Sequence, residues 1–162
     1  MFKVSFKKDC KKVQTFNDRA TIVTIVGYMA YPNEIWVCTP TFITDWLWNH
    51  PNIDFRVHSR EEFRLEFSGK AVCSAEDTFN PVIGERIAES KAKIRLYKFV
   101  HTLLYKLYVY YFGITFGDRY ALCDIGELAD YDKPGGIFEE MGKYKSLLDK
   151  ETLHLEKLLK ET

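Results

Sequence analysis

The chain has 162 residues, of which 46% are hydrophobic and 28% charged, so one folded core is expected and disordered, collagen-like and disulfide-framework classes are excluded. Lys plus Arg and Asp plus Glu both number 23, and the formal net charge of zero means that no overall field draws the chain to nucleic acid or acidic lipid. The charges are nevertheless uneven, because residues 90–117 hold five cations and no acid, whereas acids outnumber bases in 118–162.

Three strands and a short helix are predicted in the first half of the chain. Residues 20–26 are rich in β-branched side chains and 35–38 form a second apolar run, so we expect these two strands to pair as a hairpin. Residues 41–49 carry apolar side chains at helical spacing. Apolar and polar side chains alternate over 63–73, which predicts a third strand, and Gly69 within it suggests a bulge or a bend.

The start of a long helix is the clearest local signal. Asn80 is a favourable N-cap, and Pro81 suits the first helical position, where no N–H is needed. No further proline occurs before Gly113, so we expect a helix from 81 to about 111. The stretch 107–116 is rich in Tyr, Val and Phe and is also compatible with a strand, and that alternative stays open.

Three residues near this helix start are assigned structural roles. We expect Asp77 to bond turn amides, Phe79 to pack on the first helical turn as a hydrophobic staple, and Gly84 to permit a close backbone approach. The lesser alternative is a phosphate site at the helix N-terminus, where unpaired N–H groups attract anions.

The last predicted element is an amphipathic helix over 137–160, whose apolar residues recur at roughly heptad spacing. It is expected to pack on its own domain, with a dimer or partner interface as the alternative. The predicted fold is therefore α+β: a small antiparallel sheet packed by a long helix (about 81–111), with residues 1–132 as the domain and 137–162 as the C-terminal helix.

A sequence pattern covers residues 69–92. A Gly-x-Ala-x-Cys strand end is followed by an Asp-x-Phe-Asn turn and then by a helix with Gly in its first turn and Ile-Ala one turn later. This segment resembles a pattern in small uncharacterised proteins of phages and mobile elements, in which Asp is commoner at the place of Asn80. Those proteins look like α/β domains related in topology to double-stranded-RNA-binding domains. The resemblance implies a strand–turn–helix unit and no particular activity.

Four cations are expected on one face of the long helix. At 100° per residue they lie within about 80° of one another. We call this row the basic stripe: Lys91, Arg95, Lys98 and Lys106. Such a row suits an acidic protein surface as well as the phosphates of nucleic acid. The third interpretation is a solvated face packed against the chain's own acidic 118–140 region.

Motifs for catalysis are absent from the sequence. It contains no P-loop, dinucleotide-binding, zinc-protease or nucleophile-elbow motif. The four cysteines include no C-x-x-C pair and are expected to be reduced and mostly buried, with a zinc site built from distant Cys and His as a minor alternative. We therefore expect no enzyme, no cofactor and no metal site. With no apolar leader and no membrane-spanning run, a cytoplasmic protein is expected.

The functional hypothesis rests on the basic stripe and on the resemblance to small phage and mobile-element proteins. We expect a non-enzymatic phage or mobile-element protein that engages a nucleic-acid-handling protein or complex through the stripe, as an inhibitor of host defence does. The expected partner is a host or phage protein or ribonucleoprotein, and direct binding of double-stranded nucleic acid is the alternative. No membrane is expected as partner, and the chain is expected to be a monomer or a homodimer.

Overall fold

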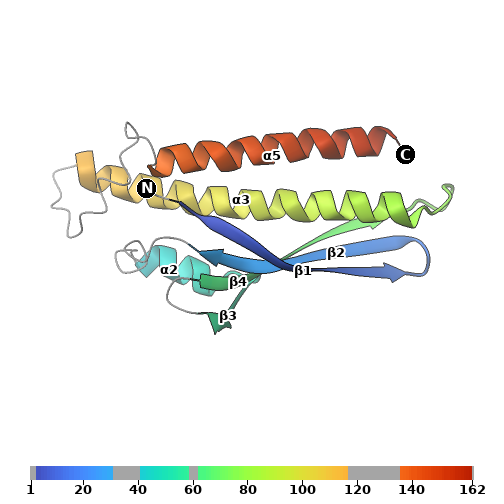
Figure 1. Ribbon diagram of the computed structural model, residues 1–162, viewed down its shortest axis with the longest axis horizontal. Helices are drawn as coiled ribbons and strands as arrows, with labels where there is room; N and C mark the ends of the chain where they lie inside the picture. Colours follow the sequence, from blue (N-terminus) through green and yellow to red (C-terminus); the bar gives the residue numbers. More distant parts are fainter. Residues whose placement is uncertain (1–2, 31–40, 59–61, 117–135, 162) are drawn as a thin grey trace.

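The computed structural model describes most of the chain: residues 3–30, 41–58, 62–116 and 136–161, with the backbone alone at 54–58 and 111–116. The elements in chain order are β1 (Ser5–Phe16), β2 (Ala20–Ala30), α2 (Thr41–Trp48), β3 (Ile53–His58), β4 (Glu62–Val72), α3 (Pro81–Phe116) and α5 (Ile137–Lys160). The strands form one antiparallel sheet in the order β1-β2-β4-β3. In Figure 1, α3 covers one face of this sheet and α5 lies along α3 on the side away from the strands. The predicted α+β fold is confirmed.

The first strand, β1, has no counterpart among the predicted strands. It is an edge strand with mostly exposed side chains, and its lysines are the charges that edge strands commonly carry against unwanted pairing. Asn17 and Asp18 turn the chain into β2 with φ values of 49° and 51°, a left-handed conformation that these two residue types tolerate. The hairpin is closed by a hydrogen bond from Arg19 N to Phe16 O at 3.0 Å.

The pairing predicted for residues 20–26 is wrong. β2 pairs with β1 along one edge and with β4 along the other over its whole length, so no edge is left for a third strand. The expected partner at 35–38 lies outside the described residues. The sheet also contains β3, a short strand at 53–58 that the sequence pattern did not predict.

Close approach of the helix, rather than a bulge, explains Gly69. The register between β2 and β4 runs without interruption through the Val23↔Gly69 pair, so the predicted bulge is wrong. A Cβ atom on Gly69 would collide with the carbonyl oxygen of Ala88 and would lie 2.7 Å from the backbone nitrogen of Ala92. α3 therefore crosses β4 at this point with its backbone almost on the strand.

The helix α3 is longer than predicted. It continues to Phe116, so the stretch 107–116 is helical, and its 36 residues span about 54 Å at 1.5 Å per residue. A large cluster of buried side chains lies between its C-terminal half and the sheet, and a smaller one lies towards its start. The smaller cluster comprises Val23, Ala71, Ile87, Ala88 and Leu158.

The last helix, α5, packs on its own chain. Ile137 and Tyr144 join the large cluster and Leu158 joins the small one, which supports the intrachain interpretation of its apolar side. A hydrogen bond of 2.7 Å from Ser90 Oγ to Glu151 Oε1 fixes α5 on α3.

The start of the chain is attached to α5. Val4 N donates to Glu140 Oε1 at 3.2 Å, and Tyr144 Oη donates to Val4 O at 3.0 Å. Both backbone groups of this buried residue are thus paired with side chains of the C-terminal helix.

Candidate partner-binding surface

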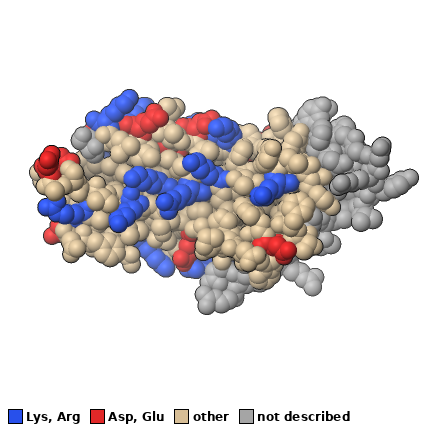
Figure 2. Space-filling model, turned by 180° about the vertical axis from the view of Figure 1, so that it is seen from behind, with Lys and Arg blue, Asp and Glu red and all other residues tan. Residues whose placement is uncertain are grey.

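The four members of the basic stripe lie on α3, with Lys106 eight positions after Lys98. Figure 2 shows Lys and Arg side chains along the middle of the face seen from behind, with acidic side chains near its margins. From Lys91 to Lys106 the row covers sixteen residues, or about 22 Å of helix. Arg95 and Lys98 are exposed, whereas the two end members are partly buried.

The first two cations of the stripe contact the backbone of β4. Lys91 Nζ donates to the carbonyl oxygen of Lys70 at 2.9 Å, and Arg95 Nη1 donates to that of Ser68 at 2.8 Å. These contacts fix both charged groups beside the strand, in contrast to mobile groups extended into solvent. The stripe and the outer edge of β4 are therefore one surface.

The outer edge of β4 is paired for only part of its length. β3 pairs with it as far as Ile53↔Leu65, and Asn52 then bonds both backbone groups of Glu66: Glu66 N donates to Asn52 O at 2.9 Å, and Asn52 Nδ2 donates to Glu66 O at 2.7 Å. Ser68 and Lys70 follow at two-residue spacing, so their N–H groups point to the same edge as Glu66. No strand in the described part of the chain pairs with them there.

The other two cations differ in their surroundings. Lys106 Nζ lies 5.2 Å from the centre of the Trp46 ring, a cation–π contact that connects the stripe to α2. Trp46 itself is stacked on Phe99, whereas Trp48 of the same helix is 54% exposed. Lys98 makes no ion pair with a described residue.

No member of the basic stripe forms an ion pair with a described acid, although nearby lysines do. Lys11 bonds Glu85 at 2.8 Å and Glu89 at 3.2 Å, and these carboxylates raise the pKa of Lys11. Burial raises the pKa of Glu89, but the bond from Lys11 and the neighbouring lysine charges outweigh it, so the net shift is downward. The acids of α3 are thus paired with other lysines. Of the acidic region 118–140, residues 118–135 lie outside the described residues.

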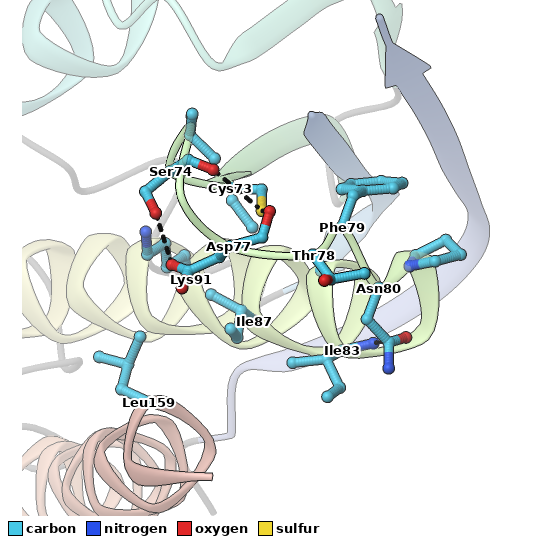
Figure 3. A pocket seen from close by; sticks show the side chains of 14 residues that line it. Cys73, Ser74, Asp77, Thr78, Phe79, Asn80, Ile83, Ile87, Lys91 and Leu159 are labelled. Carbon is cyan, nitrogen blue, oxygen red and sulfur yellow. Dashed lines mark hydrogen bonds between the residues drawn. The ribbon is translucent and has the colours of Figure 1, made fainter. Parts of the chain in front are cut away.

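A pocket of about 520 Å³ lies at the end of β4. Figure 3 shows the 73–77 turn on one side, Leu159 of α5 on the other, and Ile83 and Ile87 of α3 between them. Lys91 also lines the pocket, so the pocket adjoins the first cation of the basic stripe. Its interior is largely apolar and its rim is polar, which suits one apolar side chain better than an ion.

The helix start behaves as a structural unit. Asn80 Oδ1 accepts from Val82 N at 3.0 Å and from Ile83 N at 3.3 Å, and Asn80 O accepts from Gly84 N at 2.9 Å. Pro81 has no N–H, and the next three N–H groups are all paired with Asn80. A phosphate would therefore find no unpaired donor in the first turn, and a phosphate site at this terminus has no support. The cap roles predicted for Asn80 and Pro81 are confirmed.

Two neighbouring predictions have mixed outcomes. Among the described residues the Asp77 carboxylate bonds no turn amide, so that prediction is wrong; it accepts instead from the Ser74 hydroxyl at 2.5 Å, a side-chain bond that holds the same turn. The Phe79 ring lies 3.9 Å from where a Cβ on Gly84 would be, which places the ring beside the first helical turn, but Gly84 has no side chain for a staple to contact. Gly84 also approaches Thr21 closely, since its Cβ would lie 3.0 Å from Thr21 Oγ1.

The thiols are less buried than expected. Cys10 and Cys73 are free and half-buried, and the other two cysteines lie outside the described residues. Among described residues no three His, Cys, Asp or Glu side chains come together as a metal-binding group. No helix within the described ranges has the length and apolar character needed to cross a bilayer.

The edge of β4 beyond Glu66, with which no strand of the described residues pairs, is the feature that sequence reasoning missed. The only signal for it was that residues 63–73 are long for a strand. Asn52, which ends the pairing with β3, stands in a polar turn that gave no helix or strand signal. Comparison with family models, with curated proteins and with solved structures finds no match to this chain.

Proposed function

We propose that the chain is a non-enzymatic binding protein whose basic stripe holds an acidic surface of a partner protein. The proposed partner belongs to a nucleic-acid-handling complex in the cytoplasm, and the setting is that of a phage or mobile-element inhibitor. One observation carries the proposal: four cations along about 22 Å of helix form no ion pair with a described acid. Such a row repels itself, and an anionic partner relieves that repulsion.

A protein partner is favoured over a nucleic acid by how the stripe is held. Lys91 and Arg95 are hydrogen-bonded to the backbone of β4, so their positions are fixed. Fixed cations suit carboxylates in a defined arrangement, whereas duplex binding rests on many cations and a positive field, and this chain has zero net charge. Direct binding of double-stranded nucleic acid remains the second outcome of the test.

The test compares the protein with two charge-reversal pairs. Arg95→Glu with Lys98→Glu changes the exposed centre of the stripe, and Lys150→Glu with Lys157→Glu makes the same charge change on the exposed face of α5. Each protein is used to capture partners from host extract and is titrated with labelled duplex DNA and RNA by fluorescence polarisation. The duplex titrations are repeated at about 50 and 200 mM salt, where phosphate contacts give steeply different affinities.

Loss of one captured protein with the stripe pair only, together with flat duplex titrations, is the expected result. Equal capture by both variants, with the fold unchanged by circular dichroism, would remove the stripe from the proposal. Tight duplex binding that weakens steeply with salt and with the stripe variant would instead establish a nucleic-acid-binding module.

A further inference from the structure

We propose that the acidic partner binds as an extended strand added to the outer edge of β4. This inference rests on the proposed function and names the form of the partner at the same site. Strand addition uses main-chain hydrogen bonds for affinity and side-chain pockets for specificity. The three features that it needs occur together here: an unpaired strand edge, a row of cations beside it, and a pocket at its end.

The edge offers donors at strand spacing. Ser68 and Lys70 direct their N–H groups outward, and neither has a partner for that group among the described residues. Their side chains lie on the sheet face away from α3, since the alternate residues Phe67, Gly69 and Ala71 are buried beneath the helix. A peptide laid along 68–72 would meet about 14 Å of free strand edge.

The cations select an acidic occupant. Lys91 and Arg95 now donate to the two outward carbonyls of β4, at Lys70 and Ser68. An added strand brings its own N–H donors to those carbonyls, so the two charged groups exchange the carbonyl oxygens for carboxylates at alternate positions of the peptide while they stay beside the strand edge. The exchange conserves the backbone hydrogen bonds and adds ion pairs, so an acidic strand binds where a neutral or basic one does not.

The pocket selects an apolar residue at one end of the peptide. It begins where the free edge ends, at Ala71 and Val72, and Lys91 lines it as well (Figure 3). With a volume of about 520 Å³, it has room for a large aliphatic or aromatic side chain. The expected recognition sequence therefore alternates acidic residues and ends in one apolar anchor.

The test starts from a random dodecapeptide display library selected against the full chain. The strongest binder is synthesised with a fluorophore and titrated by polarisation against the protein and its variants. Ser68→Pro removes one outward N–H and leaves the backbone ladder to β2 intact, because edge positions tolerate proline. It also removes the Ser68 hydroxyl that bonds Thr24 Oγ1, so Ser68→Ala, which removes that hydroxyl and keeps the N–H, is its control. The Arg95→Glu with Lys98→Glu pair tests the charge, and the Lys150→Glu with Lys157→Glu pair is the matched control.

Backbone methylation of the peptide gives a second readout that leaves the protein unchanged. Methylating each peptide nitrogen in turn should weaken binding roughly tenfold at every second position, because an added strand bonds its neighbour with a period of two. The selected peptides should be rich in Asp and Glu. Ser68→Pro and the Arg95→Glu with Lys98→Glu pair should each lower the affinity for the peptide by about tenfold as well.

The outcomes separate the two proposals. Charge sensitivity without a two-residue methylation period would overturn strand addition and leave the basic stripe as a binding surface. Binders indifferent to the stripe pair would count against both proposals. A selection that yields no binder would overturn strand addition. The Lys91 and Arg95 contacts would then serve only to protect the edge of β4 against pairing with another strand.

Discussion

Gly69 of β4 lies directly under Ala88 of α3, so closely that a methyl group on the glycine would meet the Ala88 carbonyl oxygen. The contact depends on small residues on both sides. On the helix, Gly84, Ala88 and Ala92 follow one another at four-residue spacing and therefore lie on one face. This face brings α3 close enough to β4 for its lysine and arginine side chains to reach the strand backbone.

Gly69→Ala should lower the free energy of unfolding by roughly 1–3 kcal/mol or more, because α3 must move away from the sheet. Urea denaturation followed by circular dichroism measures the change. Gly142→Ala in α5 is the control: a Cβ there meets nothing within 4 Å, so the same substitution should stabilise the helix by roughly 0.5–1 kcal/mol. Equal effects at the two sites would contradict the close crossing.

Thr21→Val should leave the protein equally stable or make it more stable by about 1 kcal/mol. The Thr21 hydroxyl is buried under α3 and has no hydrogen-bond partner among the described residues, so its removal ends a desolvation cost. Thr24→Val is the matched control, since the Thr24 hydroxyl bonds Ser68 Oγ at 2.7 Å and its loss should cost about 1 kcal/mol. Thermal unfolding of both variants decides the matter, and a loss at Thr21 equal to that at Thr24 would mean that the Thr21 hydroxyl is paired.

Folding stability should fall as the pH drops below about 6.5, and His50 should carry this step. The His50 ring is partly buried among aromatic rings: its centre lies 4.7 Å from that of Phe99 and 5.4 Å from that of Trp46. This burial lowers the pKa of His50 from its ordinary value of 6.5. In that range the unfolded chain binds a proton that the folded chain does not, so stability rises with pH up to about 6.5 and is constant above it.

The measurement is the unfolding free energy at several pH values between about 5.5 and 7.5, the range around the ordinary histidine pKa. His50→Phe should flatten the slope. His154→Gln, a change on the exposed side of α5, should leave the slope as it is. A slope that follows His154 instead would show that His50 is not the group responsible.

Tyr144→Phe should destabilise the fold by about 1 kcal/mol, because Val4 O loses the hydroxyl that pairs it. Burial, with the charge of Glu140 and the neighbouring Tyr97, raises the pKa of Tyr144 from 10.0 to about 12, so an absorbance titration should show one tyrosine ionising near pH 12 that is absent from Tyr144→Phe. Tyr105→Phe is the control at a ring that is 54% exposed, and it should change stability by less than about 0.5 kcal/mol. Equal effects would mean that the bond to Val4 contributes nothing.

Elements with a strong local sequence signal were predicted correctly. The Asn80-Pro81 start of α3, the strand at 63–73 and the helix at 137–160 each follow from capping chemistry or apolar periodicity and are confirmed. β1 escaped prediction because an edge strand needs little apolar alternation, and its lysines read as a basic segment. Gly69 was misread because a glycine required by a neighbouring helix has the same sequence signature as one required by a bulge.

The candidate surface was predictable in part. Helical periodicity alone grouped the basic stripe, and all four of its members lie on the unbroken helix α3. The contacts of Lys91 and Arg95 with β4 depend on where α3 crosses the sheet, a long-range relationship that no local pattern encodes. The pocket depends likewise on Leu159, which lies nearly eighty residues after Pro81 at the start of α3, another of the lining residues.

The small-residue face of α3 makes the core a wedge. Its thin end holds few apolar side chains around Ala88, and its thick end holds Phe99, Leu103 and Leu107. Protection against amide hydrogen exchange should therefore rise along α3 from the first turns towards the thick end, since local opening is easiest where least apolar surface is buried. The free edge of β4 and the pocket both lie at the thin end, so a ligand there would stiffen the segment that opens first.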